Sequence, residues 1–259
     1  MRTFLLPEDY TPGTPLPVRE ERFHYLTRVL RLRTGDRITG TDREGTRYLL
    51  RIARVEDDEL TLETVRREDG EPDGTDRGAR RGKPQPNRWA PAAEIHLFQC
   101  LLKGKKMDAV VRQAVEAGVH RIVPVASEHA VAQYDQATRQ KKRRRWDAVI
   151  REAVQQSGSR VITEVEEPAD ISKIPGMWNS NDPGLFFHQQ PLEQSSLHRY
   201  LSQYPRRVAV AIGPEGGFSP GEIELLTDAG FLPVYLNTNV LRAETAAVYA
   251  IGAVQTILT

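Results

Sequence analysis

The residues best suited to chemistry lie in two short segments near the carboxyl end of the chain. The first, residues 212–222, is a glycine-rich loop with the acidic side chain Glu215 among its glycines. The second, residues 237–245, presents Arg242 and Glu244 just before an apolar run. Glycine lets the backbone approach a ligand closely, and a carboxylate suits a cationic or polyhydroxyl ligand better than a phosphate chain. We therefore expect a ligand loop; a strand-to-helix turn without a ligand is the alternative.

The glycine-rich loop matches neither of the common nucleotide-binding fingerprints. It lacks the Gly-x-x-x-x-Gly-Lys-Ser/Thr of phosphate loops and the Gly-x-Gly-x-x-Gly of dinucleotide sites. Residues 207–213 form an apolar run that predicts a buried strand. Ser219-Pro220-Gly221-Glu222 has the N-cap, the first-turn proline and the following glutamate of a helix start. In open α/β sheets ligands usually bind where a strand ends in this way.

Size and composition indicate a globular protein. At 259 residues the chain is long enough for one large or two moderate domains. Its one cysteine, Cys100, lies in an apolar run and is expected to be a buried small hydrophobe; a single cysteine excludes a disulfide framework and a cysteine-cluster zinc site. No apolar run reaches the roughly 18 residues of a membrane span, and the N-terminal apolar stretch is too short for a secretory signal. We expect a cytoplasmic protein.

Basic side chains cluster although the net charge is only +1. One cluster is Lys103, Lys105 and Lys106, and another is the run at residues 141–145. Local basic patches on a nearly neutral protein suit a phosphate-rich partner. The alternative for each patch is a solvated helix face.

The amino-terminal part has the pattern of a small β domain. Across residues 1–66, two strand-like runs flank a polar turn at 42–45, and residues 60–65 alternate with a period of two. Residues 67–92 carry almost no apolar side chains and cannot offset the entropy of ordering by burial. We expect a flexible basic linker or a long hairpin there.

A short helical pattern covers residues 23–31. Arg28 and Arg31 are three residues apart and should share an exposed face, whereas Val29 and Leu30 should point inward. The alternative for the two arginines is an ordinary exposed helix face.

From residue 93 to 259, strand-like runs alternate with amphipathic helical patterns, which predicts a mainly parallel sheet. The expected strands are 95–102, 122–125, 184–188, 208–212 and 232–236, and the expected helices are 107–118, 146–154, 219–229 and 243–258. Three strand ends should therefore converge, after Phe187, Ile212 and Leu236.

Four motifs in order resemble one known family. They are His24-Tyr-Leu-Thr-Arg-Val-Leu-Arg31; Lys105-Lys-Met-Asp leading to Ile-Val-Pro124; Arg145-Trp146 through Gln156-Ser157; and the glycine-rich loop followed by Leu236-Asn-Thr-Asn-Val-Leu-Arg-Ala-Glu-Thr245. Together they are similar to the RsmE family, which methylates N3 of a uridine in 16S ribosomal RNA and belongs to the knotted SPOUT class of RNA methyltransferases. The resemblance covers nearly the whole chain.

The resemblance implies an α/β fold with two domains and a linker. Residues 93–259 would form a SPOUT domain with a mainly parallel sheet and a deep trefoil knot, and residues 1–66 a PUA-like β-barrel that binds RNA. It also implies S-adenosylmethionine as cofactor, with S-adenosylhomocysteine as product and no metal. The partners would be the small ribosomal subunit with its 16S RNA and a second copy of the chain, bound through the knotted domain.

The resemblance also implies roles for individual residues. The cofactor would be held by Phe187, His188, Ile212, Gly213, Pro214, Glu215, Gly216, Gly217, Leu236, Asn237, Asn239, Val240, Leu241, Arg242 and Thr245. The RNA would be held by Arg2, His24, Arg28, Arg31, Lys103, Lys105, Lys106 and Arg160.

For catalysis, we expect Arg242 to stabilise the developing uridine anion and Glu215 or Glu244 to accept the proton or to orient Arg242. The alternative for Glu244 is a first-turn acid that only complements the helix dipole.

The chain departs from the family pattern at three places. Asn237 stands where glycine is usual, Ala243 stands where threonine is usual, and Arg160 is displaced by one position. Asn also visits the left-handed region, so the first change is tolerable. Two alternative functions stay open: a knotted methyltransferase that acts on a ribose 2′-hydroxyl or on transfer RNA, and a non-catalytic RNA-binding factor of ribosome assembly.

Overall fold

The computed structural model describes residues 3–68, 93–130, 134–178 and 181–259, and they divide into two compact units. The first unit holds the residues up to 68 together with 154–162, and the second holds the others. Arg2 and most of the predicted linker, residues 69–92, lie outside the described residues. The domain bounds inferred from the sequence stay a prediction.

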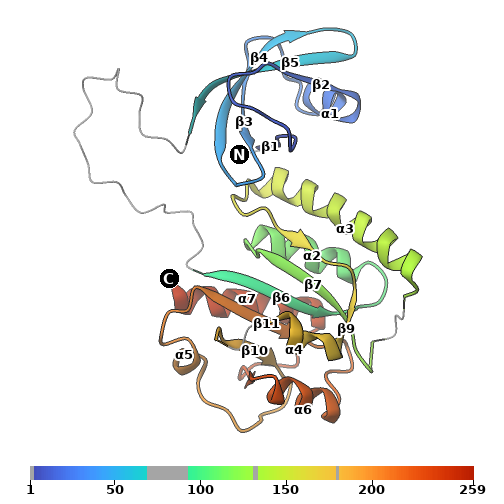
Figure 1. Cartoon of the computed structure of the whole chain (residues 1–259), viewed down its shortest axis with the longest axis vertical. Coiled ribbons are helices and arrows are strands. Elements are labelled where there is room, and N and C mark those ends of the chain that lie inside the picture. The colour runs from blue at the N-terminus through green and yellow to red at the C-terminus, as the bar shows by residue number, and fades with distance from the viewer. Residues whose placement is uncertain (1–2, 69–92, 131–133, 179–180) are drawn as a thin grey trace, which may run out of the picture. The chain divides into compact units, whose positions relative to one another are not determined.

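The first unit contains a five-stranded sheet (Figure 1). Its order is β1 (Thr3–Leu5), β3 (Arg37–Thr41), β4 (Arg47–Val55), β5 (Glu59–Arg67) and β2 (Leu16–Arg19). Only β1 and β3 are parallel. At the expected turn, the Asp42 carboxylate accepts hydrogen bonds from the backbone N–H groups of Glu44 and Thr46, each at 2.9 Å. This local bonding explains why the polar turn could be predicted from the sequence.

The expected helical segment forms, but with a different inward face. It consists of α1 (Glu20–His24) and the π-helix η1 (Tyr25–Val29). Phe23 and Leu26 are the buried side chains, and Val29 is 60% exposed. The prediction that Val29 points inward was therefore wrong, because the wider π turn shifts the phase of the face.

The carboxyl end of this segment also differs from a regular helix. Arg31 has φ of +56° and lies beyond the helix end. Its side chain and that of Arg28 are both exposed.

The second unit is built on a parallel sheet, as the strand-helix alternation predicted. Seven strands of the described residues belong to it, and every pairing is parallel. The order is β12 (Phe231–Val234), β10 (Gly184–Phe187), β11 (Arg207–Ile212), β6 (Glu94–Cys100), β7 (Arg121–Ala126) and β8 (Glu164–Val165), and β9 (Ala169–Asp170) also pairs with β7. The trefoil knot implied by the resemblance stays a prediction.

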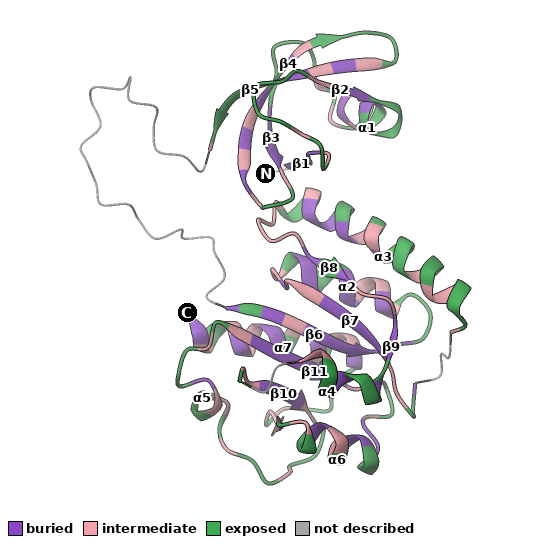
Figure 2. Cartoon of the chain, in the orientation of Figure 1, coloured by how far each residue is buried: buried purple, intermediate pink, exposed green. Residues whose placement is uncertain are grey.

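Helices cover both faces of this sheet, and its central strands are buried (Figure 2). Phe98 and Cys100 of β6 pack in one cluster with residues of α4 (Ile174–Met177) and α6 (Pro220–Asp228). The alternate side chains of β6 face the other side. There α2 (Lys106–Glu116) packs against α7 (Ala243–Leu258), and α7 also contacts β11. The remaining helices are α3 (Gln136–Ser157), η2 (Ile171–Lys173) and α5 (Leu197–Tyr200).

The register of three strands brings their carboxyl ends to one edge. Phe187 of β10 is opposite Ile212 of β11 and also opposite Val234 of β12. The three following loops therefore start side by side. This convergence was expected from the sequence, although β12 ends two residues earlier than predicted.

Cys100 is buried with 1% exposure, as predicted, and burial raises the pKa of its thiol to about 12. Within the described part of the chain, no helix combines the length and the apolar composition needed to cross a bilayer.

The pKa of His96 in β6 offers a test of the packing of the second unit. Burial, assisted by the positive charge of Arg121, lowers the pKa of His96 from 6.5 to about 4. Because the unfolded chain binds the proton more readily, the free energy of unfolding should be highest above about pH 6.5 and fall toward about pH 4. Urea unfolding at several pH values measures this loss.

His96→Gln removes the titrating group and should reduce the loss of unfolding free energy over the same pH interval. His198→Gln, at an exposed position of α5, is the matched control and should keep the wild-type slope. An equal slope in the wild-type protein and the His96 variant would contradict the assignment.

Candidate functional site

The glycine-rich loop connects β11 to α6 and folds back on itself. The N–H of Gly217 donates to the carbonyl of Pro214 at 2.9 Å, and Gly217 has φ of +76°. A Cβ atom at Gly213 would lie 3.2 Å from the backbone nitrogen of Phe218. Glycine at these two positions therefore permits a turn tight enough to form one wall of a site.

The helix start predicted after this loop is confirmed. Ser219 is the N-cap of α6, and its hydroxyl oxygen accepts from the N–H of Glu222 at 3.3 Å. The Glu222 carboxylate accepts from the N–H of Ser219 at 2.8 Å and, through its other oxygen, from the N–H of Glu128 at 2.7 Å. Glu222 is 6% exposed, so one buried carboxylate joins α6 to the loop after β7.

His129, next to Glu128, makes a second contact with the glycine-rich loop. Its Nδ1 atom lies 3.1 Å from the carbonyl oxygen of Gly217. A Cβ atom at Gly216 would lie 3.1 Å from the His129 side chain. His129 carries no signal in the sequence, because it is 88 positions away from its partner and belongs to no local pattern.

The other two loops are held by backbone hydrogen bonds. The N–H of His188 donates to the carbonyl of Val234 at 2.9 Å, which ties the loop after β10 to β12. The His188 Nδ1 atom accepts from the N–H of Gln190 at 3.2 Å. Arg242 is the N-cap residue of α7, and its carbonyl accepts from the N–H groups of Thr245 and Ala246.

The three loops enclose a cavity of about 350 Å³, within the size range of small-molecule sites. Its lining includes most residues expected at a cofactor site: Phe187, His188, Ile212, Gly213, Pro214, Glu215, Gly217, Leu236, Asn239, Val240, Leu241 and Arg242. The expected residues Gly216, Asn237 and Thr245 are not in the lining. The lining also includes residues that were not expected at a cofactor site: Lys106, Gln189, Phe218, Val234, Tyr235, Thr238, Ala243 and Ala246.

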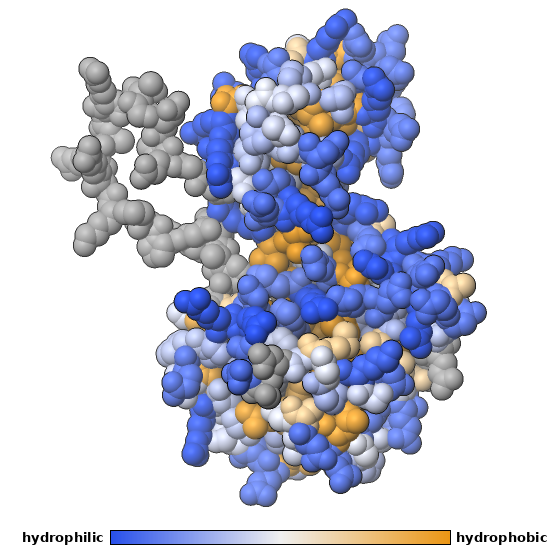
Figure 3. Space-filling view, in the orientation of Figure 1, coloured by the Kyte–Doolittle hydropathy of each residue, from blue (hydrophilic) through white to orange (hydrophobic). Residues whose placement is uncertain are grey.

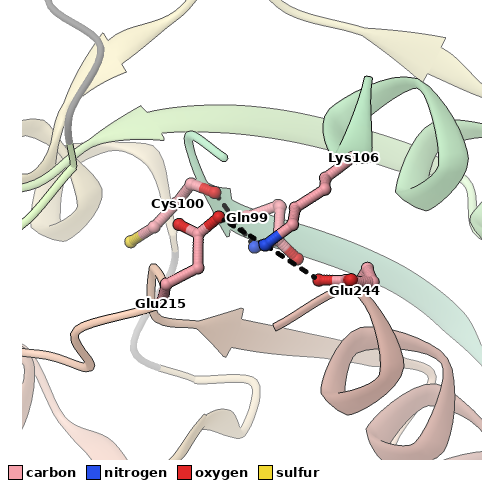
Figure 4. A network of polar contacts seen from close by, with 5 residues as sticks. All are labelled: Gln99, Cys100, Lys106, Glu215 and Glu244. Carbon is pink, nitrogen blue, oxygen red and sulfur yellow. Dashed lines mark hydrogen bonds and ion pairs between the residues drawn. The ribbon is translucent and has the colours of Figure 1, made fainter. Parts of the chain in front are cut away.

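Charged side chains converge beside the cavity (Figure 4). The Lys106 ammonium donates to the Glu215 carboxylate at 2.9 Å and lies 3.8 Å from the Glu244 carboxylate. Arg242 is close enough for its charge to act on the pKa of Lys106. The two expected proton acceptors and the expected anion-stabilising arginine are thus brought together around a lysine.

The ion pair keeps both partners charged. The hydrogen bond to Glu215 raises the pKa of Lys106 above its usual value. Burial acts to raise the pKa of Glu215, but hydrogen bonds from Lys106 and from backbone N–H groups outweigh it, so this pKa lies below its usual range. One oxygen of Glu244, Oε2, is buried and has no hydrogen-bond partner among the described residues.

The arrangement suits a ligand with an apolar body and charged ends. Apolar side chains such as Phe187, Ile212 and Leu241 form part of the wall. Glu215 and Glu244 offer negative charge to a cationic group, and Arg242 offers positive charge to a carboxylate. Within the described residues, no group of three His, Cys, Asp or Glu side chains is arranged to hold a metal ion.

The residues expected to bind RNA differ in their placement. His24, Lys103 and Lys105 are exposed, as are Arg28 and Arg31. Arg160 is half-buried in the first unit, and its carbonyl oxygen would lie 2.4 Å from a Cβ atom at Gly45.

In the basic run at 141–145, Arg145 is engaged in an ion pair with Asp108. Lys142 lies over the ring of Tyr134 at 5.5 Å.

Two family models match the chain. Residues 90–255 match the model described as an RNA methyltransferase domain, and residues 18–65 match the model described as an RNA methyltransferase PUA domain. The first match alone covers well over half of the chain.

Curated relatives are similar along most of their length. The ribosomal RNA small subunit methyltransferase E of Buchnera aphidicola subsp. Acyrthosiphon pisum is 26% identical over 238 residues, which are 92% of this chain and 86% of that protein. The protein of the same name from Aquifex aeolicus is 29% identical over 238 residues, with 91% and 92% covered.

Two solved structures share the fold. Ribosomal RNA small subunit methyltransferase E from Neisseria gonorrhoeae, bound to S-adenosyl methionine, has a TM-score of 0.81 and 27% identity, with 99% of this chain and 98% of that chain covered. A Legionella pneumophila methyltransferase in complex with the cofactor SAM has a TM-score of 0.82 and 29% identity, with 98% and 96% covered.

The bridging role of Glu222 can be tested by an isosteric change. Glu222→Gln leaves one acceptor oxygen where two are used, so the N–H of Ser219 or of Glu128 should lose its partner. Since hydrogen bonds to a charged group contribute about 1.5–3 kcal/mol, the free energy of unfolding should fall by about that amount. Urea unfolding measures it. Glu224→Gln, at an exposed position of the same helix, is the control and should change the free energy of unfolding by less than about 0.5 kcal/mol. Equal effects of the two changes would show that Glu222 does not bridge α6 and the loop after β7.

Proposed function

We propose that this chain, which belongs to the RNA methyltransferase domain family, transfers a methyl group from S-adenosylmethionine to N3 of a uridine in the 16S RNA of the small ribosomal subunit. The family match confirms the resemblance found in the sequence. The observation that carries this proposal is the cavity where β10, β11 and β12 end, with Arg242 and two carboxylates beside it. The relatives named as small-subunit methyltransferases support the choice of RNA.

The chemistry of the cavity fits S-adenosylmethionine. Its apolar walls suit the adenine ring, and Tyr235, Thr238 and Asn239 add polar groups along the lining. A carboxylate such as that of Glu215 or Glu244 suits a cationic sulfonium or ammonium group. The tight turn at Gly213 and Gly217 leaves backbone close to the ligand.

Side chains around the cavity can stabilise charge and accept a proton in the reaction. When bound, S-adenosylmethionine supplies an electrophilic methyl group. In our proposal Arg242 stabilises the negative charge that develops on a uridine carbonyl oxygen. Glu215 or Glu244 accepts the N3 proton. The Oε2 atom of Glu244 accepts no hydrogen bond from the described residues, which favours Glu244, because the Glu215 carboxylate already accepts from Lys106.

RNA binding is proposed to use exposed basic side chains of both units. His24, Arg28 and Arg31 of the first unit and Lys103 and Lys105 of the second are exposed. Hydrophilic side chains dominate the visible surface (Figure 3). The dependence of RNA binding on salt concentration tests this proposal, because each phosphate contact steepens it.

A homodimer through the second unit is part of the proposal. Val240 is 79% exposed and Tyr249, on α7, is 51% exposed. Large apolar or aromatic side chains at such positions favour burial against a second copy. Sedimentation of the protein in solution tests whether it forms this homodimer.

The decisive experiment is analysis of the methylated nucleoside. Small ribosomal subunits that lack this modification are incubated with the protein and labelled S-adenosylmethionine, and their RNA is digested to nucleosides. We expect label in N3-methyluridine. Label in a 2′-O-methyl nucleoside, or only in transfer RNA, would overturn the assigned target, and no transfer by a protein that binds the cofactor would favour an assembly factor.

Arg242→Ala should separate catalysis from cofactor binding. Because the guanidinium is assigned to charge that develops during reaction, the turnover number should fall by about 100-fold or more. The dissociation constant of S-adenosylmethionine, measured by calorimetry, should stay within about tenfold. Arg199→Ala, at an exposed position of α5, is the matched control. Unchanged turnover would remove Arg242 from the mechanism.

A further inference from the structure

Lys106 is not placed like its two neighbouring lysines. Lys103 and Lys105 are exposed, whereas Lys106 lines the cavity and its side chain is 36% exposed. It is hydrogen-bonded to Glu215 and faces Glu244. Two carboxylates so close would repel a phosphate group, so the surroundings of Lys106 do not suit the phosphate contact expected from the sequence.

The Lys106 ammonium has N–H donors that its contact with Glu215 does not use. An ammonium group has three N–H donors. One is used at 2.9 Å by Glu215, and the 3.8 Å separation from Glu244 is too long for a hydrogen bond. The remaining donors lie beside the cavity.

A buried amide strengthens the case for a ligand at this point. Gln99 is fully buried at the end of β6, on the face that α2 and α7 cover. Its Nε2 atom donates to the carbonyl of Cys100 at 3.0 Å, and its Oε1 atom has no hydrogen-bond partner among the described residues. Figure 4 draws Gln99 in the same view as Lys106, which lies between Glu215 and Glu244. Gln99 Oε1 and Glu244 Oε2 each lack a hydrogen bond among the described residues, and a bound ligand can supply one.

Charges of both signs lie around the cavity. Lys106 and Arg242 are donors only, and the carboxylates of Glu215 and Glu244 are acceptors. The pairing edge of uridine presents the carbonyl acceptor O4, the N3–H donor and the carbonyl acceptor O2. Cytidine presents a donor, an acceptor and an acceptor. Two donors and one carboxylate drawn from this set would complement uridine and not cytidine.

We propose that Lys106 is a specificity-determining residue that donates a hydrogen bond to one pairing-edge carbonyl of the target uridine, while Arg242 donates to the other carbonyl and Glu215 or Glu244 accepts from N3–H. This inference rests on the proposed function. In the reaction the N3–H bond breaks and its proton passes to the carboxylate. The N3–CH₃ bond forms with the nitrogen electron pair, and the electrons of the former S–CH₃ bond stay on sulfur.

The test combines a protein variant with an altered base. Lys106→Met and the wild-type protein are compared on small-subunit RNA that carries uridine, 4-thiouridine or 2-thiouridine at the target position. With uridine, Lys106→Met should lower the turnover number by at least about tenfold. Sulfur is a weaker acceptor than oxygen, so the thio base at the carbonyl bound by Lys106 should slow the wild-type protein. It should cause no further loss in the variant, because the hydrogen bond is already absent.

Three controls keep the result specific. Lys106→Arg retains a donor and should recover most of the lost turnover. Lys173→Met, at an exposed position of η2, removes a lysine outside the site and should behave as wild type. Calorimetry of S-adenosylmethionine binding to Lys106→Met should give a dissociation constant within about threefold of wild type, and this also reports a folded site.

Several outcomes would overturn the inference. Additive losses with both thio bases would show that Lys106 contacts neither carbonyl. A dissociation constant for S-adenosylmethionine raised more than about tenfold would assign Lys106 to the cofactor. A loss confined to RNA affinity, with a shallower salt dependence, would assign it to a phosphate. If the wild-type protein produces no N3-methyluridine, the proposed function fails instead, so the two failures are distinguishable.

Discussion

The parallel register of β10, β11 and β12 is the constraint on which the site depends. Phe187 is opposite both Ile212 and Val234, so three strands end at one level. Hydrogen bonds of a parallel sheet fix this alignment more rigidly than loops could. The three loops that follow can therefore enclose one cavity, although their sequences are separated by whole helices.

Polar contacts then give the loops a defined shape. The Glu222 carboxylate serves α6 and the loop after β7 together, and His129 lies against Gly217. The Glu222 contacts are costly to break, because each leaves a backbone N–H that is at least partly buried without a partner. The side chains of Glu222 and His129 are not part of the cavity lining, which leaves the inner surface of the glycine-rich loop open to a ligand.

Elements with a local signal were predictable. The capping box at Ser219 and Glu222, the turn at Asp42 and the apolar strands of the second unit each depend on neighbours only a few positions away. Predictions were weaker where a tertiary detail mattered. The π turn exposes Val29, and no short periodic pattern in the sequence predicts a π turn.

The sequence by itself determined the alternation of strands and helices, the tight glycine turn and the resemblance to RNA methyltransferases, because these depend on residue types and short spacings. Only the tertiary structure decided that Lys106 faces Glu215, 109 positions away, and not solvent beside Lys105. The positive charge of a lysine follows from its residue type alone. Its partner depends on the packing of α2 beside α7 over the sheet, and that packing depends on contacts between residues far apart in the chain.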